Sequence, residues 1–203
     1  MHNTKTKKIA FLDRDGVVNA DLGYVHSVKK FNLCKGFVKG AKYLLSQNYE
    51  LVIITNQAGI ARGYYTQEDF IQFSNWIYSF LKKMGVTISS TYYCPHHPDF
   101  TGGCDCRKPK PQMIIDALNC YRVSPNDCLL IGDKNSEIYK QINKHEIGWV
   151  FSWDEEEEII KFLNKLPDKE LIEKLGIRSR EISENFFSEN EILSQIKNEI
   201  IEL

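Results

Sequence analysis

Short apolar runs that alternate with segments of helical spacing constrain the fold of this chain more than any other sequence feature. The β-rich runs cover residues 9–12, 51–55, 90–93, 128–131 and 149–151. Between them, apolar side chains recur at helical intervals over 37–45, 70–81, 113–118 and 138–142. Strands joined by helices form right-handed crossovers and a mainly parallel sheet with helices on both faces. The sequence therefore predicts a doubly wound, Rossmann-like α/β fold.

The size and composition of the chain indicate one domain. With 203 residues, 42% of them hydrophobic, the chain can bury one substantial core. We expect residues 1–153 to form the α/β domain. Residues 154–203 carry 14 acidic and 7 basic residues and are predicted to form an acidic helical extension packed on that domain.

Charge and hydropathy exclude some classes of partner. The net charge of −1 argues against a nucleic-acid-binding protein, because such proteins rely on a basic surface. No apolar run approaches the roughly 18 residues of a membrane span, and the polar N-terminus lacks a signal-type apolar region. We expect a cytoplasmic, monomeric protein that contacts neither a membrane nor nucleic acid.

Chemically active residues follow four of the predicted strands. In a doubly wound sheet, ligands bind at the carboxyl ends of the strands, so these positions are predicted to share one site. They are Asp13-Arg14-Asp15-Gly16, Thr55-Asn56-Gln57, Cys94-Pro95-His96-His97 and Gly132-Asp133-Lys134.

Three aspartates dominate the predicted site. Asp13 and Asp15 follow the first strand, and Asp133 follows the fourth. Carboxylates that converge at one sheet edge either repel one another or share a hard cation such as Mg²⁺, which also takes a substrate phosphate. The pattern indicates phosphate chemistry with a carboxylate nucleophile. In isolation the two neighbouring aspartates would fit a helix cap or a calcium loop equally well.

Polar and basic residues nearby could hold the phosphate. Thr55 offers a hydroxyl, and Lys108 and Lys134 offer ammonium groups for the oxygens of a transferring phosphoryl group. The guanidinium of Arg107 can grip a substrate anion with two hydrogen bonds.

The cysteine-rich loop 94–106 has the composition of a structural zinc site. Three thiolates and one imidazole make a closed tetrahedral set, and alternate residues of an extended loop point the same way. The spacing does not choose between His96 and His97. Such a loop would hold the residues that follow it, Arg107 and Lys108, toward the phosphate. The predicted zinc ligands are Cys94, Cys104, Cys106 and one of the two histidines, His96 or His97.

Six ordered motifs resemble a known family. Over residues 8–153 the chain is similar to the D-glycero-D-manno-heptose 1,7-bisphosphate 7-phosphatases of the haloacid dehalogenase superfamily. Histidinol-phosphate phosphatases share part of the pattern. The motifs are FLDRDG (11–16), GYVH (23–26), TNQAGIARG (55–63), YYCPHHP (92–98), CDCRKP (104–109) and IGDK (131–134).

The resemblance implies a Mg²⁺-dependent phosphatase of bacterial heptose biosynthesis, for lipopolysaccharide, capsule or S-layer precursors. It implies a phosphoaspartyl intermediate on Asp13, with Asp15 as general acid and base. Mg²⁺ would bind Asp13, the backbone carbonyl of Asp15, and Asp133, while Thr55 and Lys108 would stabilise the phosphoryl group. The resemblance favours His96 as the zinc ligand. It assigns the sugar-phosphate substrate to Asp21, Gly23, Tyr24, Asn56, Gln57, Arg107 and Lys134.

The spacing of the motifs leaves no room for a cap domain. Only 39 residues separate Asp15 from Thr55, and a turn, the segment 23–26 and one helix occupy most of them. The resemblance likewise implies a capless enzyme whose pocket walls are loops. Glu137, four residues after Asp133, is not among the predicted metal ligands.

Two alternative functions stay open at the level of sequence. One is a histidinol-phosphate phosphatase or another small phosphomonoesterase. The other, from a different class, is a non-catalytic zinc-loop binding or scaffold protein. The acidic cluster argues against nucleic acid as its ligand, because unscreened carboxylates repel a phosphate backbone.

Overall fold

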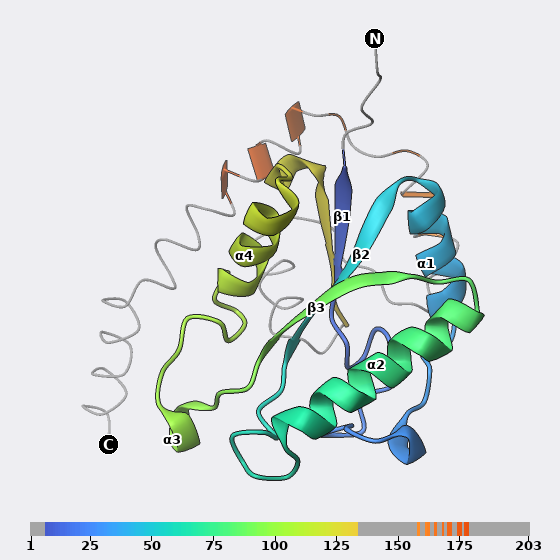
Figure 1. Cartoon of the computed structure of the whole chain (residues 1–203). Helices are drawn as coiled ribbons and strands as arrows, with labels where there is room; N and C mark the ends of the chain where they lie inside the picture. The colour runs from blue at the N-terminus through green and yellow to red at the C-terminus, as the bar shows by residue number, and fades with distance from the viewer. Residues whose placement is uncertain are drawn as a thin grey trace.

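The computed structural model describes residues 7–133 and, beyond them, residues 158, 161, 162, 165, 168, 170, 171, 174, 175, 177 and 178 (Figure 1). The expected helix at 138–142, the expected strand at 149–151, Lys134, Glu137 and most of the expected extension 154–203 lie outside these residues. The strands are β1 (Lys8–Leu12), β2 (Tyr49–Asn56), β3 (Ile88–Cys94) and β4 (Cys128–Ile131). The helices are α1 (Phe37–Ser46), α2 (Gln67–Lys83), α3 (Pro98–Thr101) and α4 (Gln112–Tyr121), with 3-10 turns at Val28–Lys30 and Pro125–Asp127.

The four strands form one parallel sheet in the order β3-β2-β1-β4. The last residue of β1, Leu12, aligns with Ile53 of β2 and with Ile131 of β4. The carboxyl ends of three neighbouring strands therefore meet at one edge of the sheet. The predicted mainly parallel α/β fold is confirmed for the described part of the chain.

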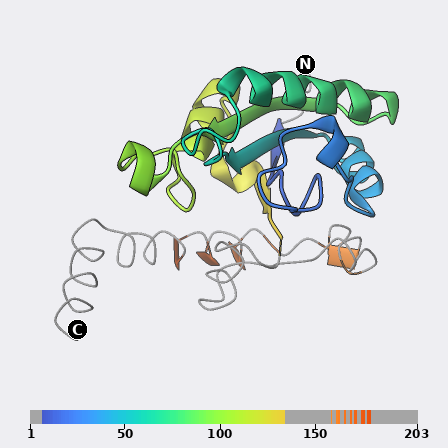
Figure 2. The ribbon, with the colours of Figure 1, turned by 90° about the horizontal axis from the view of Figure 1, so that it is seen from below.

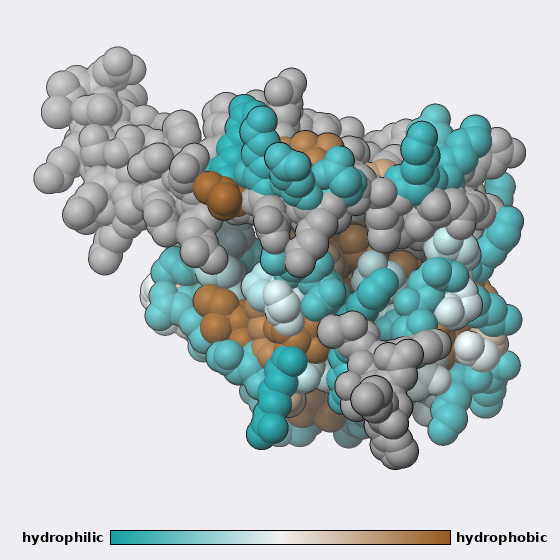
Figure 3. Space-filling model, turned by 90° about the horizontal axis from the view of Figure 1, so that it is seen from above, coloured by the Kyte–Doolittle hydropathy of each residue, from teal (hydrophilic) through white to brown (hydrophobic). Residues whose placement is uncertain are grey.

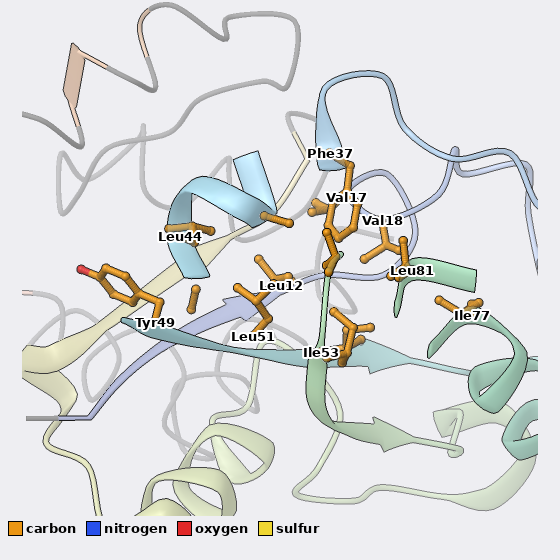
Figure 4. Close-up of a cluster of buried hydrophobic side chains, with 14 of the residues drawn as sticks. Leu12, Val17, Val18, Phe37, Leu44, Tyr49, Leu51, Ile53, Ile77 and Leu81 are labelled. Carbon is orange, nitrogen blue, oxygen red and sulfur yellow. The ribbon is translucent and has the colours of Figure 1, made fainter. Parts of the chain in front are cut away.

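Helices cover both faces of the sheet, and each face has its own apolar cluster. Alternate side chains of a strand point to opposite faces, so one strand contributes to both clusters. Leu12 and Ile53 face α1 and α2, where they meet residues such as Phe37 and Leu81 (Figure 4). On the opposite face, Ile9, Phe11, Val52 and Ile54 pack with Met113 and Ala117 of α4. Figure 2 shows the sheet from below, with α2 lying along it. Burial on both faces explains why these strands are continuous apolar runs.

The helix α2 begins at a reciprocal cap that ends the loop after β2. The Thr66 hydroxyl accepts a hydrogen bond from the Asp69 amide at 3.1 Å, and the Asp69 carboxylate accepts from the Thr66 amide at 2.9 Å. A cap of this kind contributes about 1 kcal/mol. It fixes where the loop 57–65 ends, and this loop forms one wall of the candidate site.

The outer surface is largely polar on the side where β1 begins. In that view, hydrophilic residues surround smaller hydrophobic areas on the described part of the molecule (Figure 3). No helix within the described residues combines the length and apolar character needed to cross a membrane.

Candidate active site

The loop that follows β1 lies directly against the residue that follows β4. The Asp13 amide donates a hydrogen bond to the Ile131 carbonyl at 2.9 Å, which ties the two strand ends together. Gly16 adopts a φ of +86°, and a Cβ placed there would lie 2.7 Å from Asp133 Cβ. Only glycine allows the turn and this close approach. The third carboxylate therefore reaches the loop that carries the first two.

Lys108 forms the closest charged contact to Asp13. Its Nζ lies 2.6 Å from Asp13 Oδ2 and donates to the Ile54 carbonyl at 3.1 Å. The backbone of Lys108 is held by Asn56, whose Oδ1 accepts from the Lys108 amide at 3.0 Å and whose Nδ2 donates to the Lys108 carbonyl at 3.2 Å. Asn56 thus attaches the loop before α4 to the end of β2.

Burial and a neighbouring cation shift the pKa of the Asp13 carboxyl in opposite directions. Burial raises the pKa of the Asp13 carboxyl, and the Lys108 ammonium and a hydrogen bond from the Arg14 amide only partly offset this. Because the low-dielectric surroundings disfavour the negative charge of the Asp13 carboxylate, they favour a further cation beside it, in addition to the Lys108 ammonium.

Asp15 is held by three side chains. Arg14 Nη2 donates to Asp15 Oδ2 at 2.8 Å and to Oδ1 at 3.0 Å, and Arg14 Nε lies 3.3 Å from Oδ1. Asn19 Nδ2 donates to Oδ1 at 2.9 Å, and Gln57 Nε2 donates to Oδ2 at 3.2 Å. Both oxygens of the carboxylate therefore have protein donors.

The polar atoms of Gln57 are all used inside the protein. Besides Asp15, its Nε2 donates to Thr55 Oγ1 at 2.8 Å, and its Oε1 accepts from the Tyr65 hydroxyl at 2.7 Å. Burial raises the pKa of Tyr65 to about 12, so this hydroxyl keeps its proton at neutral pH. The chain Tyr65-Gln57-Thr55 fixes the direction of the Thr55 hydroxyl at the end of β2.

A cavity of about 420 Å³ lies at this edge of the sheet. It brings together eleven predicted catalytic, Mg²⁺-binding and substrate-binding residues, whereas the twelfth, Lys134, lies outside the described residues. Ala58, Tyr65, His97 and Pro109 also line it, although none of them was predicted to bind the substrate or to take part in catalysis. The predicted residues in the lining are Asp13, Asp15, Asp21, Gly23, Tyr24, Thr55, Asn56, Gln57, Arg107, Lys108 and Asp133.

Arg14 and Asn19 are buried partners of Asp15 that the sequence reasoning missed. Arg14 is 1% exposed and Asn19 is fully buried. The only available signal was position: Arg14 stands between the two aspartates, and Asn19 stands four residues after the second. Neither position alone distinguishes a buried partner from a solvated side chain.

The predicted metal loop gathers its four ligand atoms in one place. The atoms all lie within 4.8 Å of one another. Cys104 Sγ is 3.5 Å from Cys94 Sγ and 3.6 Å from Cys106 Sγ, and His96 Nδ1 is 3.4 Å from Cys106 Sγ. Tetrahedral Zn²⁺ with Zn–S bonds of about 2.3 Å requires sulfur atoms about 3.8 Å apart. The cluster therefore has the size and the donor chemistry of a tetrahedral metal site.

The structure distinguishes the two neighbouring histidines. His96 lies in the cluster, whereas His97 Nε2 lies 2.9 Å from Arg62 Nη2 and His97 Nδ1 accepts from the Asp99 amide at 3.3 Å. The loop also contacts the pocket wall, because Arg107 Nη1 donates to the His96 carbonyl at 3.3 Å.

The chain is similar to known phosphatases. The family model described as polynucleotide kinase 3 phosphatase matches residues 8–169. A D-glycero-alpha-D-manno-heptose-1,7-bisphosphate 7-phosphatase of Campylobacter jejuni is 37% identical over 189 residues, which cover 93% of this chain and 99% of that protein. The corresponding beta-heptose phosphatase of Pasteurella multocida is 43% identical over 132 residues, 63% of this chain and 72% of that protein.

A solved structure is also similar. The D,D-heptose 1,7-bisphosphate phosphatase from B. bronchiseptica, crystallised with magnesium and phosphate, has a TM-score of 0.58 and 34% sequence identity. The match covers 62% of this chain and 70% of that chain. Together with the relative that matches along nearly its full length, it shows that the chain belongs to the heptose 1,7-bisphosphate 7-phosphatase family of haloacid dehalogenase-like phosphatases.

Proposed function

We propose that this protein is a Mg²⁺-dependent phosphatase that removes the 7-phosphate of D-glycero-D-manno-heptose 1,7-bisphosphate in bacterial heptose biosynthesis. The observation that carries the proposal is the pairing of Asp13 with Lys108 at 2.6 Å, in a cavity that Asp15 and Asp133 also line. Relatives with this activity in their names match the chain at about 40% identity.

In the first step, an oxygen of Asp13 attacks the phosphorus atom of the 7-phosphate. The bond from phosphorus to the sugar oxygen breaks, and Asp15, protonated at the start, donates its proton to that oxygen. Asp13 then carries the phosphoryl group. The Lys108 ammonium and the Thr55 hydroxyl donate hydrogen bonds to the phosphoryl oxygens as their charge increases.

In the second step, water attacks the phosphorus atom of the phosphoaspartyl group. Asp15, now a carboxylate, accepts a proton from this water, and the bond between phosphorus and the Asp13 oxygen breaks. Inorganic phosphate leaves, Asp13 is again a carboxylate, and Asp15 is again protonated. The same aspartate serves both steps because the first leaves it in the form that the second requires.

The donor set suits Mg²⁺. The residues proposed to hold it are Asp13 and Asp133 through their carboxylates and Asp15 through its backbone carbonyl, and hard oxygen donors of this kind are what Mg²⁺ prefers. The close approach of Asp133 to Gly16 and the burial of Asp13 support this assignment. When bound, Mg²⁺ neutralises charge on the phosphate and on the carboxylates around it.

A substrate comparison tests the proposed activity. We expect phosphate release from the 7-position of D-glycero-D-manno-heptose 1,7-bisphosphate that requires Mg²⁺ and is absent after chelation. Both C1 anomers are assayed because the names of the relatives include both. Activity on histidinol phosphate alone would support the proposed phosphatase mechanism but would contradict heptose bisphosphate as the substrate. No turnover of any phosphomonoester would reject the enzyme and favour the non-catalytic binding or scaffold function.

We further propose that the loop 94–106 binds structural Zn²⁺. Cys94, His96, Cys104 and Cys106 would supply all four ligands of a tetrahedral ion, which would leave no position open for water or substrate. Its proposed task is to support the backbone that carries Arg107 and Lys108. We also propose that the protein is a monomer in the bacterial cytoplasm, where reducing conditions preserve free thiolates.

Changing one zinc ligand is expected to reduce both zinc content and activity. Cys104→Ser removes a thiolate, so we expect purified protein to lose most of its bound zinc. We also expect turnover to fall about 100-fold, because small displacements of a positioning group have effects of this size. Zinc is measured by elemental analysis and turnover by phosphate release. Cys128→Ser is the control, since Cys128 lies outside the loop. Full zinc content in Cys104→Ser would contradict the proposed ligand set.

A further inference from the structure

We propose that Arg14 is a positioning residue that fixes the orientation of the Asp15 carboxylate and links it to the backbone of the segment 21–26. This inference rests on the proposed role of Asp15 as proton donor and acceptor. Arg14 itself is not assigned any contact with substrate. Its side chain is 2% exposed, and its Nη2 reaches both Asp15 oxygens, at 3.0 and 2.8 Å.

The surroundings of Arg14 leave its guanidinium little freedom. Its Cζ lies 5.7 Å from the ring centre of Phe70 and 5.6 Å from that of Phe73, both on α2. These distances allow cation–π attraction, which is stronger when the cation is withdrawn from water. Arg14 Nη1 is buried without a hydrogen-bond partner among the described residues. The aromatic rings and Asp15 therefore set the position of the guanidinium.

A second contact connects Arg14 to the segment 21–26, which includes residues proposed to recognise the substrate. Arg14 Nη2 donates to the carbonyl of Val25 at 2.6 Å, and Val25 is fully buried. The next residue, His26, stacks on Tyr65 with ring centres 4.7 Å apart. Asp21, Gly23 and Tyr24, at the other end of the segment, line the cavity. One guanidinium nitrogen thus contacts both the proton-transferring residue and the backbone beside the pocket wall.

The chemistry explains why a permanent cation is useful at this place. Asp15 would gain and lose a proton in every catalytic cycle, whereas arginine keeps its charge at any physiological pH. A planar donor fork that does not titrate returns the carboxylate to the same orientation after each transfer. Asn19 and Gln57 donate one hydrogen bond each to Asp15, so neither reproduces the geometry of the fork.

The test compares leaving groups rather than total activity. The leaving group of an activated aryl phosphate, such as 4-nitrophenyl phosphate, departs without being protonated. The leaving groups of phenyl phosphate and of the heptose substrate must be protonated as they depart. For Arg14→Met we expect kcat/KM to fall about 100-fold on phenyl phosphate and less than about tenfold on 4-nitrophenyl phosphate. Because kcat/KM for both substrates scales with the folded fraction, partial misfolding cancels in their ratio.

Three further variants sharpen the test. Arg14→Lys keeps the charge without the fork and is expected to recover only part of the loss on phenyl phosphate. Arg62→Met is the matched control, because Arg62 also contacts a neighbouring side chain and lies over an aromatic ring, yet it forms neither a hydrogen bond nor an ion pair with Asp15. For this variant the ratio of kcat/KM on phenyl phosphate to kcat/KM on 4-nitrophenyl phosphate is expected to equal the wild-type ratio. In an Asp15→Asn background, adding Arg14→Met should leave the ratio unchanged.

The outcomes separate this inference from the proposed function. Equal losses on both substrates in Arg14→Met would assign Arg14 a purely structural role and overturn the inference, while wild-type activity would still support the phosphatase. A further change of the ratio in the Asp15→Asn background would also overturn it, because Arg14 would then act independently of Asp15. Wild-type protein without activity on any phosphomonoester would overturn the proposed function and this inference together.

Discussion

Asp13→Asn is expected to lower Mg²⁺-dependent phosphate release at least about 10⁴-fold, because the amide cannot form the phosphoaspartyl bond. Asparagine has nearly the same shape, and burial already disfavours the charge of Asp13, so the variant is expected to fold. Phosphate release is measured with heptose bisphosphate at saturating Mg²⁺, and folding is measured by thermal unfolding.

Asp116→Asn provides the matched control for this substitution. Asp116 is exposed on α4, where its carboxylate accepts a hydrogen bond from Gln112 at 2.7 Å. Its activity is expected to equal that of the wild type. If folded Asp13→Asn retained more than about one hundredth of wild-type turnover, the nucleophile would have to be another residue.

Lys108→Met is expected to lower kcat about 10²- to 10³-fold, the usual effect of removing one donor to a developing negative charge. The Lys108 side chain is 12% exposed, and its ammonium lies 2.6 Å from the carboxylate proposed to carry the phosphoryl group. Methionine fills similar space without charge, so packing is retained. The rate of phosphate release at saturating substrate gives kcat directly.

Lys110 offers a control two residues away. Its side chain is 52% exposed and pairs with Asp105 at 3.0 Å, at the protein surface. Surface pairs of this kind contribute little, and Lys110→Met is expected to keep wild-type kcat. A loss of less than about threefold in Lys108→Met would show that the ammonium does not act on the transferring phosphoryl group.

The strands and long helices could be predicted because their apolar periodicity is strong. The expected strand at 9–12 corresponds to β1 at Lys8–Leu12, and the expected helix at 70–81 corresponds to α2 at Gln67–Lys83. The observed elements extend beyond the predicted boundaries because polar residues at the ends of helices and strands carry no periodic signal. The helix α3 and the 3-10 turns were missed because elements of three or four residues are too short to show a period.

The meeting of Asp13 and Asp133 was predictable, whereas the internal partners of the other polar residues were not. Position after a parallel strand is sufficient to bring carboxylates to one edge. It does not specify which hydrogen bonds a side chain forms. Asn56 and Gln57 line the cavity as expected, yet their amides bind Lys108, Thr55 and Asp15 within the protein. Such pairings depend on loop conformation, which has no pattern in the sequence.

The sheet order also determines when during synthesis the site becomes complete. The strand β1 lies between β2 and β4, and Asp133 follows Asp13 by 120 residues. At about 5–20 residues per second, a ribosome makes Asp133 about 6–24 s after Asp13. During that interval the nascent chain can pair β1 with β2, but it lacks one proposed metal ligand. We therefore expect unfinished chains that lack Asp133 to hydrolyse no phosphate esters, and we expect binding of Mg²⁺ to report that β4 has docked.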